Sequence, residues 1–160
     1  MRKQRGFSLI ELLIVVAIIL IIASIAIPNL LRARIAANEA SAVASVRTLN
    51  TAQISYNSAY PTVGFASGIT NLGPGAGGTC TPTSATACLI DSALAAGTKS
   101  GYSFRIAGTT GTPTSTYQFI ATPLAPNQTG TRYFCSFADA VVRAASATIS
   151  TCDGTVTPLQ

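Results

Sequence analysis

The sequence has no histidine and few charged residues, and both shortages limit the chemistry that the chain can perform. Charged residues make up 9% of its 160 residues, whereas ordinary soluble domains are about a quarter charged. Without histidine, Ser-His-Asp triads and Cys-His pairs are excluded. The acidic residues are scattered and form no catalytic pair: Glu11, Glu39, Asp91, Asp139 and Asp153. We therefore predict that the chain is not an enzyme.

Signatures of cofactor and metal sites are also missing. The segment 71–78 is rich in glycine, but no Gly-Lys-Ser/Thr follows it, so it is not a phosphate-binding loop. Asp139 and Asp153 are candidates for a calcium site, but Ca²⁺ takes about six to eight oxygen ligands and nearby carboxylates are few. We prefer the interpretation that both side chains face solvent. We predict no cofactor and no metal.

The net charge of +5 suggests a nucleic acid or an acidic membrane as a partner, but the distribution of the charge argues otherwise. Arg2, Lys3 and Arg5 are three of the ten basic residues, so seven bases and five acids remain after them, a balance of +2. Arg32 and Arg34 closely follow an apolar segment, so a position beside a membrane explains them. We predict no specific nucleic-acid partner.

A long apolar segment begins at Phe7 and runs to Ile27, with Ser24 as the one polar residue after Glu11. As a helix, residues 7–27 would span roughly 31 Å, about the thickness of the hydrocarbon core of a bilayer. The basic residues before the segment hold the N-terminus in the cytoplasm. We predict a transmembrane helix over 7–27, with the chain after Pro28 on the outer side.

A cleavable secretory signal peptide is the alternative, and Ser24-Ile25-Ala26 offers a small-x-small cleavage site. The apolar run, however, reaches or exceeds the limit of about 15 residues for such segments. Glu11 also lies inside the apolar stretch, where a charge costs on the order of 2.5–3.5 kcal/mol at a helix centre and less near the interface. Such a carboxylate needs a partner, and the free α-amino group of a neighbouring chain can supply one if the leader is cut before Phe7.

The residues Arg5-Gly6-Phe7-Ser8-Leu9-Ile10-Glu11, followed by Leu12-Leu13-Ile14-Val15-Val16, resemble the class III signal of type IV pilins and type II secretion pseudopilins. The matching features are a basic leader, a glycine, a phenylalanine, a glutamate and an apolar helix with a proline, Pro28, near its end. The resemblance is strong over about residues 1–60 and weak beyond them.

The resemblance implies that a prepilin peptidase removes residues 1–6 by cutting between Gly6 and Phe7, and that it N-methylates Phe7. The apolar helix is then kept. Glu11 pairs with the Phe7 amine of an adjacent subunit and sets the register, as single buried polar residues do in coiled coils. We take Phe7, Glu11 and Pro28 as the assembly residues. The alternative is that the Glu11 carboxylate extends to the lipid headgroups.

Beyond the membrane segment the pattern predicts an amphipathic helix over 28–60. We expect Pro28, which lacks an N–H, to kink or locally melt the helix. One apolar stripe then follows: Leu31, Ile35, Ala42, Val46, Leu49, Tyr56 and Tyr60. The segment 29–57 has no Gly or Pro and is rich in Ala, and Tyr60-Pro61 should end the helix. The stripe must pack on the chain's own C-terminal half.

Residues 61–160 form the predicted head. The part 61–100 has the pattern of an irregular αβ-loop with a short helical turn at 91–96. Four strand patterns follow, separated by Gly/Thr/Pro-rich turns: Tyr102–Ile106, Tyr117–Ala121, Arg132–Phe137 and Ala140–Arg143. The predicted fold is α+β, with a long N-terminal α-helix packed on a small C-terminal antiparallel β-sheet of three or four strands.

Four cysteines in a chain with an export signal indicate disulfide bonds. Three pairings are open, and Cys80–Cys88 with Cys135–Cys152 is the simplest because the members of each pair are close in sequence. A metal site is the alternative, but no CxxC spacing is present. In position, Cys135–Cys152 resembles the exposed C-terminal disulfide loop of type IV pilins.

Three functions are compatible with these patterns. The first is a structural subunit of a type IV pilus: an inner-membrane precursor with its head in the periplasm, which the pilus assembly machinery turns into a homopolymeric extracellular filament. The second is a pseudopilin of a type II secretion system, and the third is a monomeric, signal-anchored periplasmic protein. The four cysteines and the Ser/Thr-rich head favour the first, and the Phe7/Glu11 pair argues against the third.

Overall fold

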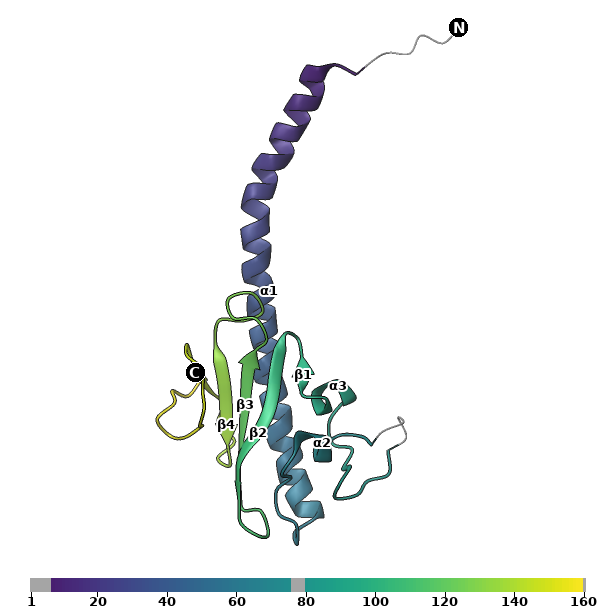
Figure 1. Cartoon of the computed structure of the whole chain (residues 1–160), viewed down its shortest axis with the longest axis vertical. Coiled ribbons are helices and arrows are strands. Elements are labelled where there is room, and N and C mark those ends of the chain that lie inside the picture. Colours follow the sequence, from purple (N-terminus) through teal and green to yellow (C-terminus); the bar gives the residue numbers. More distant parts are fainter. Residues whose placement is uncertain (1–6, 76–79, 160) are drawn as a thin grey trace. The chain divides into compact units, whose positions relative to one another are not determined.

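The computed structural model describes residues 7–75 and 80–159, and the chain divides into two units between Arg34 and Ile35. The first unit is helical. The second unit combines the continuation of the same helix with a β-sheet, so the predicted α+β fold is confirmed (Figure 1). Helix α1 runs from Leu9 to Ala59 and therefore contributes to both units.

Helix α1 contains no glycine, and it continues without interruption through Pro28. The local melting expected at Pro28 is therefore wrong. A proline removes one i→i−4 hydrogen bond, here the bond to the carbonyl of Ser24, while the helix continues on both sides. The Ser24 hydroxyl donates to the Ile21 carbonyl at 2.8 Å. The helix ends where predicted, just before Tyr60-Pro61.

The sheet has five antiparallel strands in the order β1-β2-β3-β4-β5. Their bounds are β1 Thr98–Lys99, β2 Tyr102–Thr110, β3 Thr116–Pro123, β4 Tyr133–Phe137 and β5 Arg143–Ala145. Three of the four predicted strand patterns coincide with the cores of β2, β3 and β4. In the register, Phe104 faces Ala121 and Ile120 faces Cys135.

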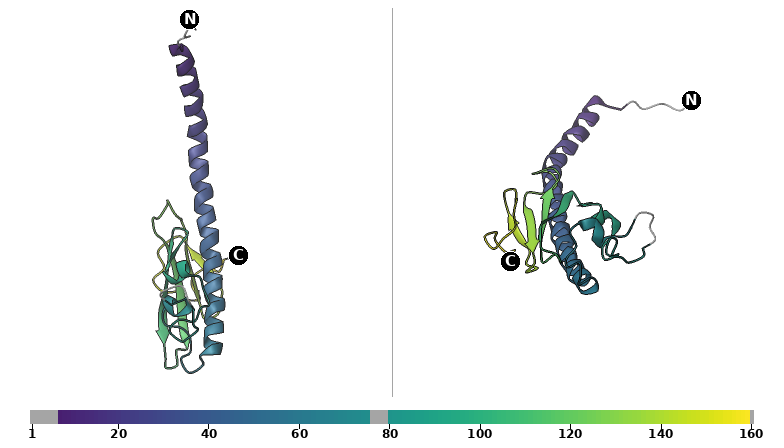
Figure 2. Two further views of the ribbon diagram at one scale, coloured as in Figure 1. Left: turned by 90° about the vertical axis from the view of Figure 1, so that its right-hand side faces the viewer. Right: turned by 60° about the horizontal axis from the view of Figure 1, so that its bottom comes forward.

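One face of the sheet packs against the second half of α1, as the left view of Figure 2 shows. Of the predicted apolar stripe, Ala42, Val46, Leu49 and Tyr56 are buried in the core. They pack in one cluster with side chains of alternate strand positions: Tyr102, Phe104, Tyr117, Phe119, Ala121 and Phe134. The alternation along β2 and β3 thus directs the aromatic residues to the helix, as period-two side-chain placement requires.

The other face of the sheet carries a second, smaller cluster, which the C-terminal segment covers. Ile120 and Cys135 on the strands are buried with Ile149 and Cys152 of that segment. Cys135 is bonded to Cys152, and Cys80 to Cys88, so the structure has the simplest of the three pairings. The disulfide of Cys135 joins β4 to the segment that shields this face from water.

The fourth predicted strand, Ala140–Arg143, is misplaced: β5 begins only at Arg143. Ala140 adopts a left-handed backbone conformation with φ of 59°, and the Asp139 carboxylate accepts from the N–H of Val141 at 3.0 Å. These residues therefore form a turn after β4. The chain end adds a further contact to β5, because the N–H of Ala144 donates to the Thr157 carbonyl at 3.0 Å.

Two single-turn helices lie in the region predicted to be irregular. The predicted turn at 91–96 is confirmed as α3, Ser92–Ala95, and the Asp91 carboxylate caps it by accepting from the N–H of Leu94 at 2.9 Å. Helix α2, Ile69–Leu72, was not predicted and overlaps the glycine-rich segment. Residues 76–78 of that segment fall outside the described residues.

Removing the buried disulfide by Cys135→Ser and Cys152→Ser should lower the free energy of unfolding by about 3 kcal/mol, because the unfolded chain regains loop freedom. Urea unfolding of the full chain in detergent micelles measures this loss. The matched control removes Cys80–Cys88, which is separated by 8 residues rather than 17 and should cost about 2.5 kcal/mol. If only the control lowered the free energy of unfolding, the stabilising role of the Cys135–Cys152 disulfide would be contradicted.

Candidate functional site

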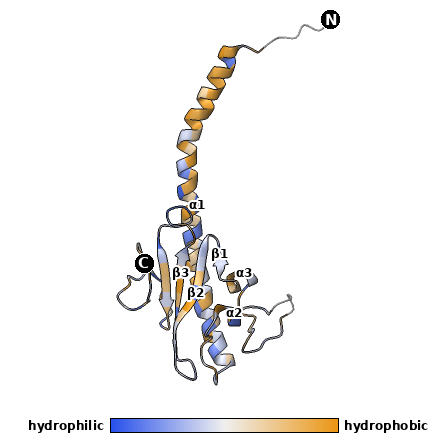
Figure 3. Ribbon diagram, viewed as in Figure 1, coloured by the Kyte–Doolittle hydropathy of each residue, from blue (hydrophilic) through white to orange (hydrophobic). Residues whose placement is uncertain are grey.

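The first unit presents a continuous apolar surface, which Figure 3 shows on the N-terminal part of α1. The exposed fraction of the large apolar side chains is 78% at Phe7 and still 45% at Leu31. By length and composition α1 can cross a membrane, and none of the residues in its most apolar window, of mean hydropathy 3.2, is buried. Exposed apolar patches of this size mark surfaces that another apolar phase covers.

Glu11 lies in the first turn of α1, where it takes part in a local interaction that our sequence analysis did not consider. The backbone N–H of Ser8 donates to the Glu11 carboxylate at 3.4 Å, and the N–H of Glu11 donates to the Ser8 carbonyl at 3.1 Å. A serine with a glutamate three residues later is the signature of a capping box. The Ser8-x-x-Glu11 spacing was therefore a readable signal for a local role of the carboxylate.

The structure distributes the other predicted site residues as follows. Gly6 lies outside the described residues, and Phe7 is exposed just before the first turn of α1. Pro28 is inside the helix. The first basic residue after Glu11 in the helix is Arg32, roughly 31 Å further along the axis at about 1.5 Å per residue. Within the described part of the first unit, no basic side chain can therefore reach the Glu11 carboxylate of the same chain.

Glu39 is a buried charged residue of the second unit that sequence reasoning missed. Its carboxylate accepts from the N–H and the hydroxyl of Thr131, each at 2.8 Å, and from the N–H of Arg132 at 3.1 Å. The Arg132 guanidinium adds an ion pair at 2.7 Å. Burial raises the pKa of Glu39, but these donors outweigh it and hold the pKa below its usual range. The loop before β4 is thus tied to α1.

Further along α1, buried amides replace apolar residues on the face toward the sheet. Asn50 donates to the Ser136 hydroxyl at 2.8 Å. Gln53 exchanges two hydrogen bonds with the backbone of Ala66, at 2.9 and 2.8 Å. The partners of each amide lie on other segments of the chain. These contacts could therefore not be predicted from the residue type or its spacing. Buried polar groups with satisfied partners specify one arrangement of the packed elements.

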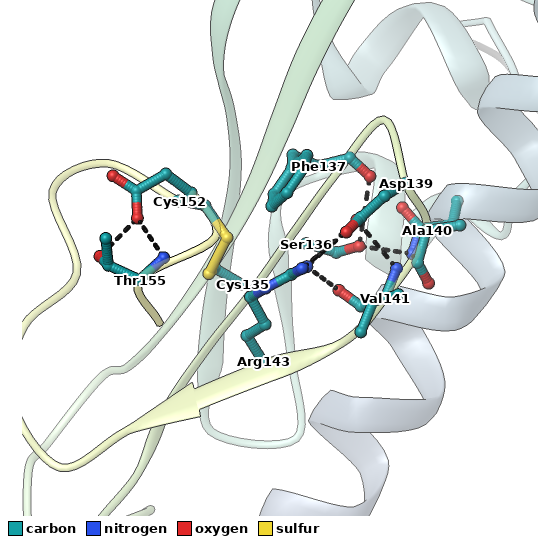
Figure 4. Close-up of polar contacts among 11 residues, drawn as sticks. Cys135, Ser136, Phe137, Asp139, Ala140, Val141, Arg143, Cys152 and Thr155 are labelled. Carbon is teal, nitrogen blue, oxygen red and sulfur yellow. Dashed lines mark hydrogen bonds and ion pairs between the residues drawn. A yellow bond between two sulfur atoms is a disulfide. The ribbon is translucent and has the colours of Figure 1, made fainter. Parts of the chain in front are cut away.

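We predicted that Asp139 simply faces solvent, but its carboxylate forms an ion pair within the head. Its carboxylate receives two hydrogen bonds from the Arg143 guanidinium, at 3.1 and 2.6 Å, and the guanidinium lies over the Phe137 ring (Figure 4). Burial raises the pKa of Asp139, but the bonds from Arg143 and the Val141 N–H outweigh it and lower the pKa. Among the described residues, no three His, Cys, Asp or Glu side chains gather to hold a metal ion.

The N-terminal segment matches a known family model. Residues 1–27 match the prokaryotic N-terminal methylation motif. The major component of the type IV wide pilus of Thermus thermophilus is 64% identical over 39 residues, which cover 24% of this chain and 30% of that one. The N-terminal part of the chain is of the prepilin type, and over that part the chain is similar to type IV pilins and to a type II secretion pseudopilin.

Two further relatives are similar to this chain, one of them a pilin and the other a secretion-system protein. The type IV major pilin protein of Myxococcus xanthus is 48% identical over 54 residues, covering 34% of this chain and 24% of that one. Core protein G of the type II secretion system of Vibrio cholerae is 45% identical over 65 residues, covering 39% and 44%. The prepilin-like chain therefore spans less than half the length of these relatives. No solved structure matches it.

In the prepilin-like chain, Glu39→Gln should lower the free energy of unfolding at neutral pH by about 1.5–3 kcal/mol, because a hydrogen-bonded ion pair is lost. The pKa of Glu39 is lower in the folded state than its unfolded value of 4.5, so the ionised carboxylate stabilises the fold at pH values above 4.5. This stabilisation disappears as the pH falls through the folded pKa, so the variant should lose less stability on acidification. Urea unfolding between neutral and acidic pH measures both effects.

The matched control is Asp153→Asn, the same carboxylate-to-amide change at an exposed position without a basic partner among the described residues. It should lower the stability at neutral pH by less than Glu39→Gln does. Equal losses in the two variants would contradict the anchoring role of Glu39.

Proposed function

We propose that the chain is a structural subunit of a type IV pilus, which polymerises through its hydrophobic N-terminal helix into an extracellular filament. The observation that carries the proposal is the exposed apolar surface from Phe7 to Leu31, joined to a folded head by the same helix. Before assembly the inner membrane covers this surface, and afterwards the helices of other subunits do. The N-terminal methylation motif and the two pilus relatives support the same role.

Processing follows from the prepilin-type N-terminus. A prepilin peptidase cuts between Gly6 and Phe7 on the cytoplasmic side of the inner membrane, and Phe7 is then N-methylated. The head lies in the periplasm, because the basic residues of the leader keep the N-terminus inside. The mature chain begins at Phe7, and the assembly machinery of the pilus moves it from the membrane into a homopolymer.

Glu11 pairs with the new α-amino group of Phe7 in a neighbouring subunit. A carboxylate in an apolar bundle is unfavourable alone, and an ammonium partner offsets its desolvation. The basic side chain nearest along the helix is Arg32, too far away to serve within one chain. The apolar surfaces of neighbouring helices, including the part around Pro28, would accept many axial offsets. The ion pair selects one of them.

A pseudopilin of a type II secretion system is the second candidate. The observation in its favour is the 45% identity to core protein G of Vibrio cholerae, which extends over more residues than the match to either pilus relative. Against it, two disulfides hold the head of this chain, which suits a subunit exposed outside the cell. Both candidates use the same membrane helix and the same pairing of Glu11.

The two candidates differ in where the mature chain accumulates. For a pilus subunit, filaments sheared from cells should consist mainly of this chain, and N-terminal sequencing of them should begin at methylated Phe7. Recovery in the inner-membrane fraction alone, with the same N-terminus, would favour the pseudopilin. A soluble chain that begins after Ala26 would refute both.

The capping box and the pairing between subunits make different predictions for Glu11. Glutamine preserves a capping box but carries no charge, so Glu11→Gln isolates the ion pair. If the carboxylate pairs with a neighbouring amine, Glu11→Gln and Glu11→Ala should both reduce the filament yield about tenfold or more, since removing one member of a buried ion pair costs about 3–5 kcal/mol. The yield of sheared filament measures this, and processing of the precursor should continue in both variants.

Normal filament yield from Glu11→Gln, with a deficit only in Glu11→Ala, would assign Glu11 to local capping and remove it from the contact between subunits.

A further inference from the structure

A groove opens on the face of the sheet that α1 does not cover. It has a volume of about 460 Å³, and the hairpin of β2 and β3 meets the C-terminal segment there. Its lining is largely apolar and includes Phe137, Ala138, Gly108 and Gly154, and Asp153 is one of its polar lining residues. Figure 4 shows Phe137 close to the Cys135–Cys152 disulfide, which holds the C-terminal segment in place.

Asp153 differs from the other acidic residues of the head. Glu39, Asp91 and Asp139 each form an ion pair, with Arg132, Lys99 and Arg143 respectively. Asp153 forms none with the residues that the structure describes. The N–H and the hydroxyl of Thr155 donate to its carboxylate at 2.9 and 2.5 Å. These two bonds, and then the positive charge of Arg143, lower the pKa of Asp153. The groove therefore carries an ionised carboxylate, and the Arg143 guanidinium lies over the Phe137 ring of the same lining.

The complementary surface lies on α1. Arg47 is exposed, and no acidic side chain of the described chain pairs with it. Ile54 is 56% exposed, and at seven positions from Arg47 it lies on the same side of the helix, roughly 10 Å away along the axis. Arg105 also lacks an acidic partner, but it donates to the Ser150 carbonyl at 3.5 Å within its own head.

We propose that the groove of one subunit receives the Arg47–Ile54 surface of α1 from a second copy of the chain, with the Arg47 guanidinium against the Asp153 carboxylate. This inference rests on the proposed function and names a contact between heads within the filament. Arginine suits the groove, because its aliphatic stem covers apolar surface while its guanidinium binds a carboxylate. Ile54 meets the apolar lining around Phe137.

The geometry of the two surfaces favours a polymer over a closed dimer. The groove opens on one face of the sheet, and α1 covers the other face. Each subunit therefore offers two different, complementary surfaces, and such a heterologous contact repeats from copy to copy without closing unless the rotation forms a ring. A self-complementary dimer would need the groove and α1 of both partners to meet at the same time.

Charge reversal tests the contact in cells that make the full chain. Arg47→Asp and Asp153→Arg each place like charges together, which suppresses association, so each should lower the yield of sheared filament about tenfold, equivalent to about 1.4 kcal/mol. The double variant Arg47→Asp with Asp153→Arg restores opposite charges and should return the yield to near that of the unmodified chain. Recovery in the double variant also shows that both substitutions permit folding.

The matched control is Thr48→Asp, which adds a negative charge at an exposed position that points about 100° away around the helix; its yield should stay near normal. Single reversals that assemble normally, or a double variant as deficient as the singles, would overturn the contact while leaving the filament proposal intact. Absence of filaments from the unmodified chain would overturn both proposals together.

Discussion

The apolar surface of residues 7–31 is the constraint on which the other features depend. None of the most apolar window of α1 is buried within the chain, and each Å² of such surface left in water costs about 25 cal/mol. No rearrangement of a single helix can hide a surface that surrounds it. A bilayer or the helices of other chains can cover this segment, and the proposed membrane precursor and filament each provide one of these covers.

The head, unlike the apolar segment, buries its own apolar residues, and it must hold α1 in one fixed position on the sheet with a small core. Glu39 and the two buried amides, Asn50 and Gln53, add directional bonds from α1 to three separate segments of the head. Their partners are all satisfied, so they specify position without leaving a polar group unpaired.

Glu11 makes a local contact in the single chain that leaves room for the proposed contact between subunits. In the single chain its carboxylate accepts from the Ser8 N–H in the first turn of α1, a weak bond by its length of 3.4 Å. Such a bond leaves acceptor capacity on the carboxylate for an ammonium group, since an ionised carboxylate has about four lone-pair sites. Capping and pairing are therefore compatible in geometry.

Much of the architecture was readable from the sequence, because it depends on local periodicity. The uninterrupted apolar run, the stripe of Val46, Leu49 and Tyr56, and the alternation in β2, β3 and β4 each reflect a repeat that one element imposes on its own residues. The local motif at Gly6, Phe7 and Glu11 predicted the N-terminal methylation motif in the same way. The Ser8-x-x-Glu11 spacing, which brings the Ser8 N–H to the Glu11 carboxylate, is equally local.

Other features required the tertiary structure, because they join residues that chain proximity does not relate. The burial of Glu39 depends on Thr131 and Arg132, which lie more than 90 residues further along the chain. The groove at Asp153 arises where a hairpin and the C-terminal segment meet across the sheet. Sequence alone determined the long helix, the strands β2, β3 and β4, and the exposed apolar surface of α1. Only the fold decided which polar groups meet, because a charged side chain has no periodicity that reveals its partner.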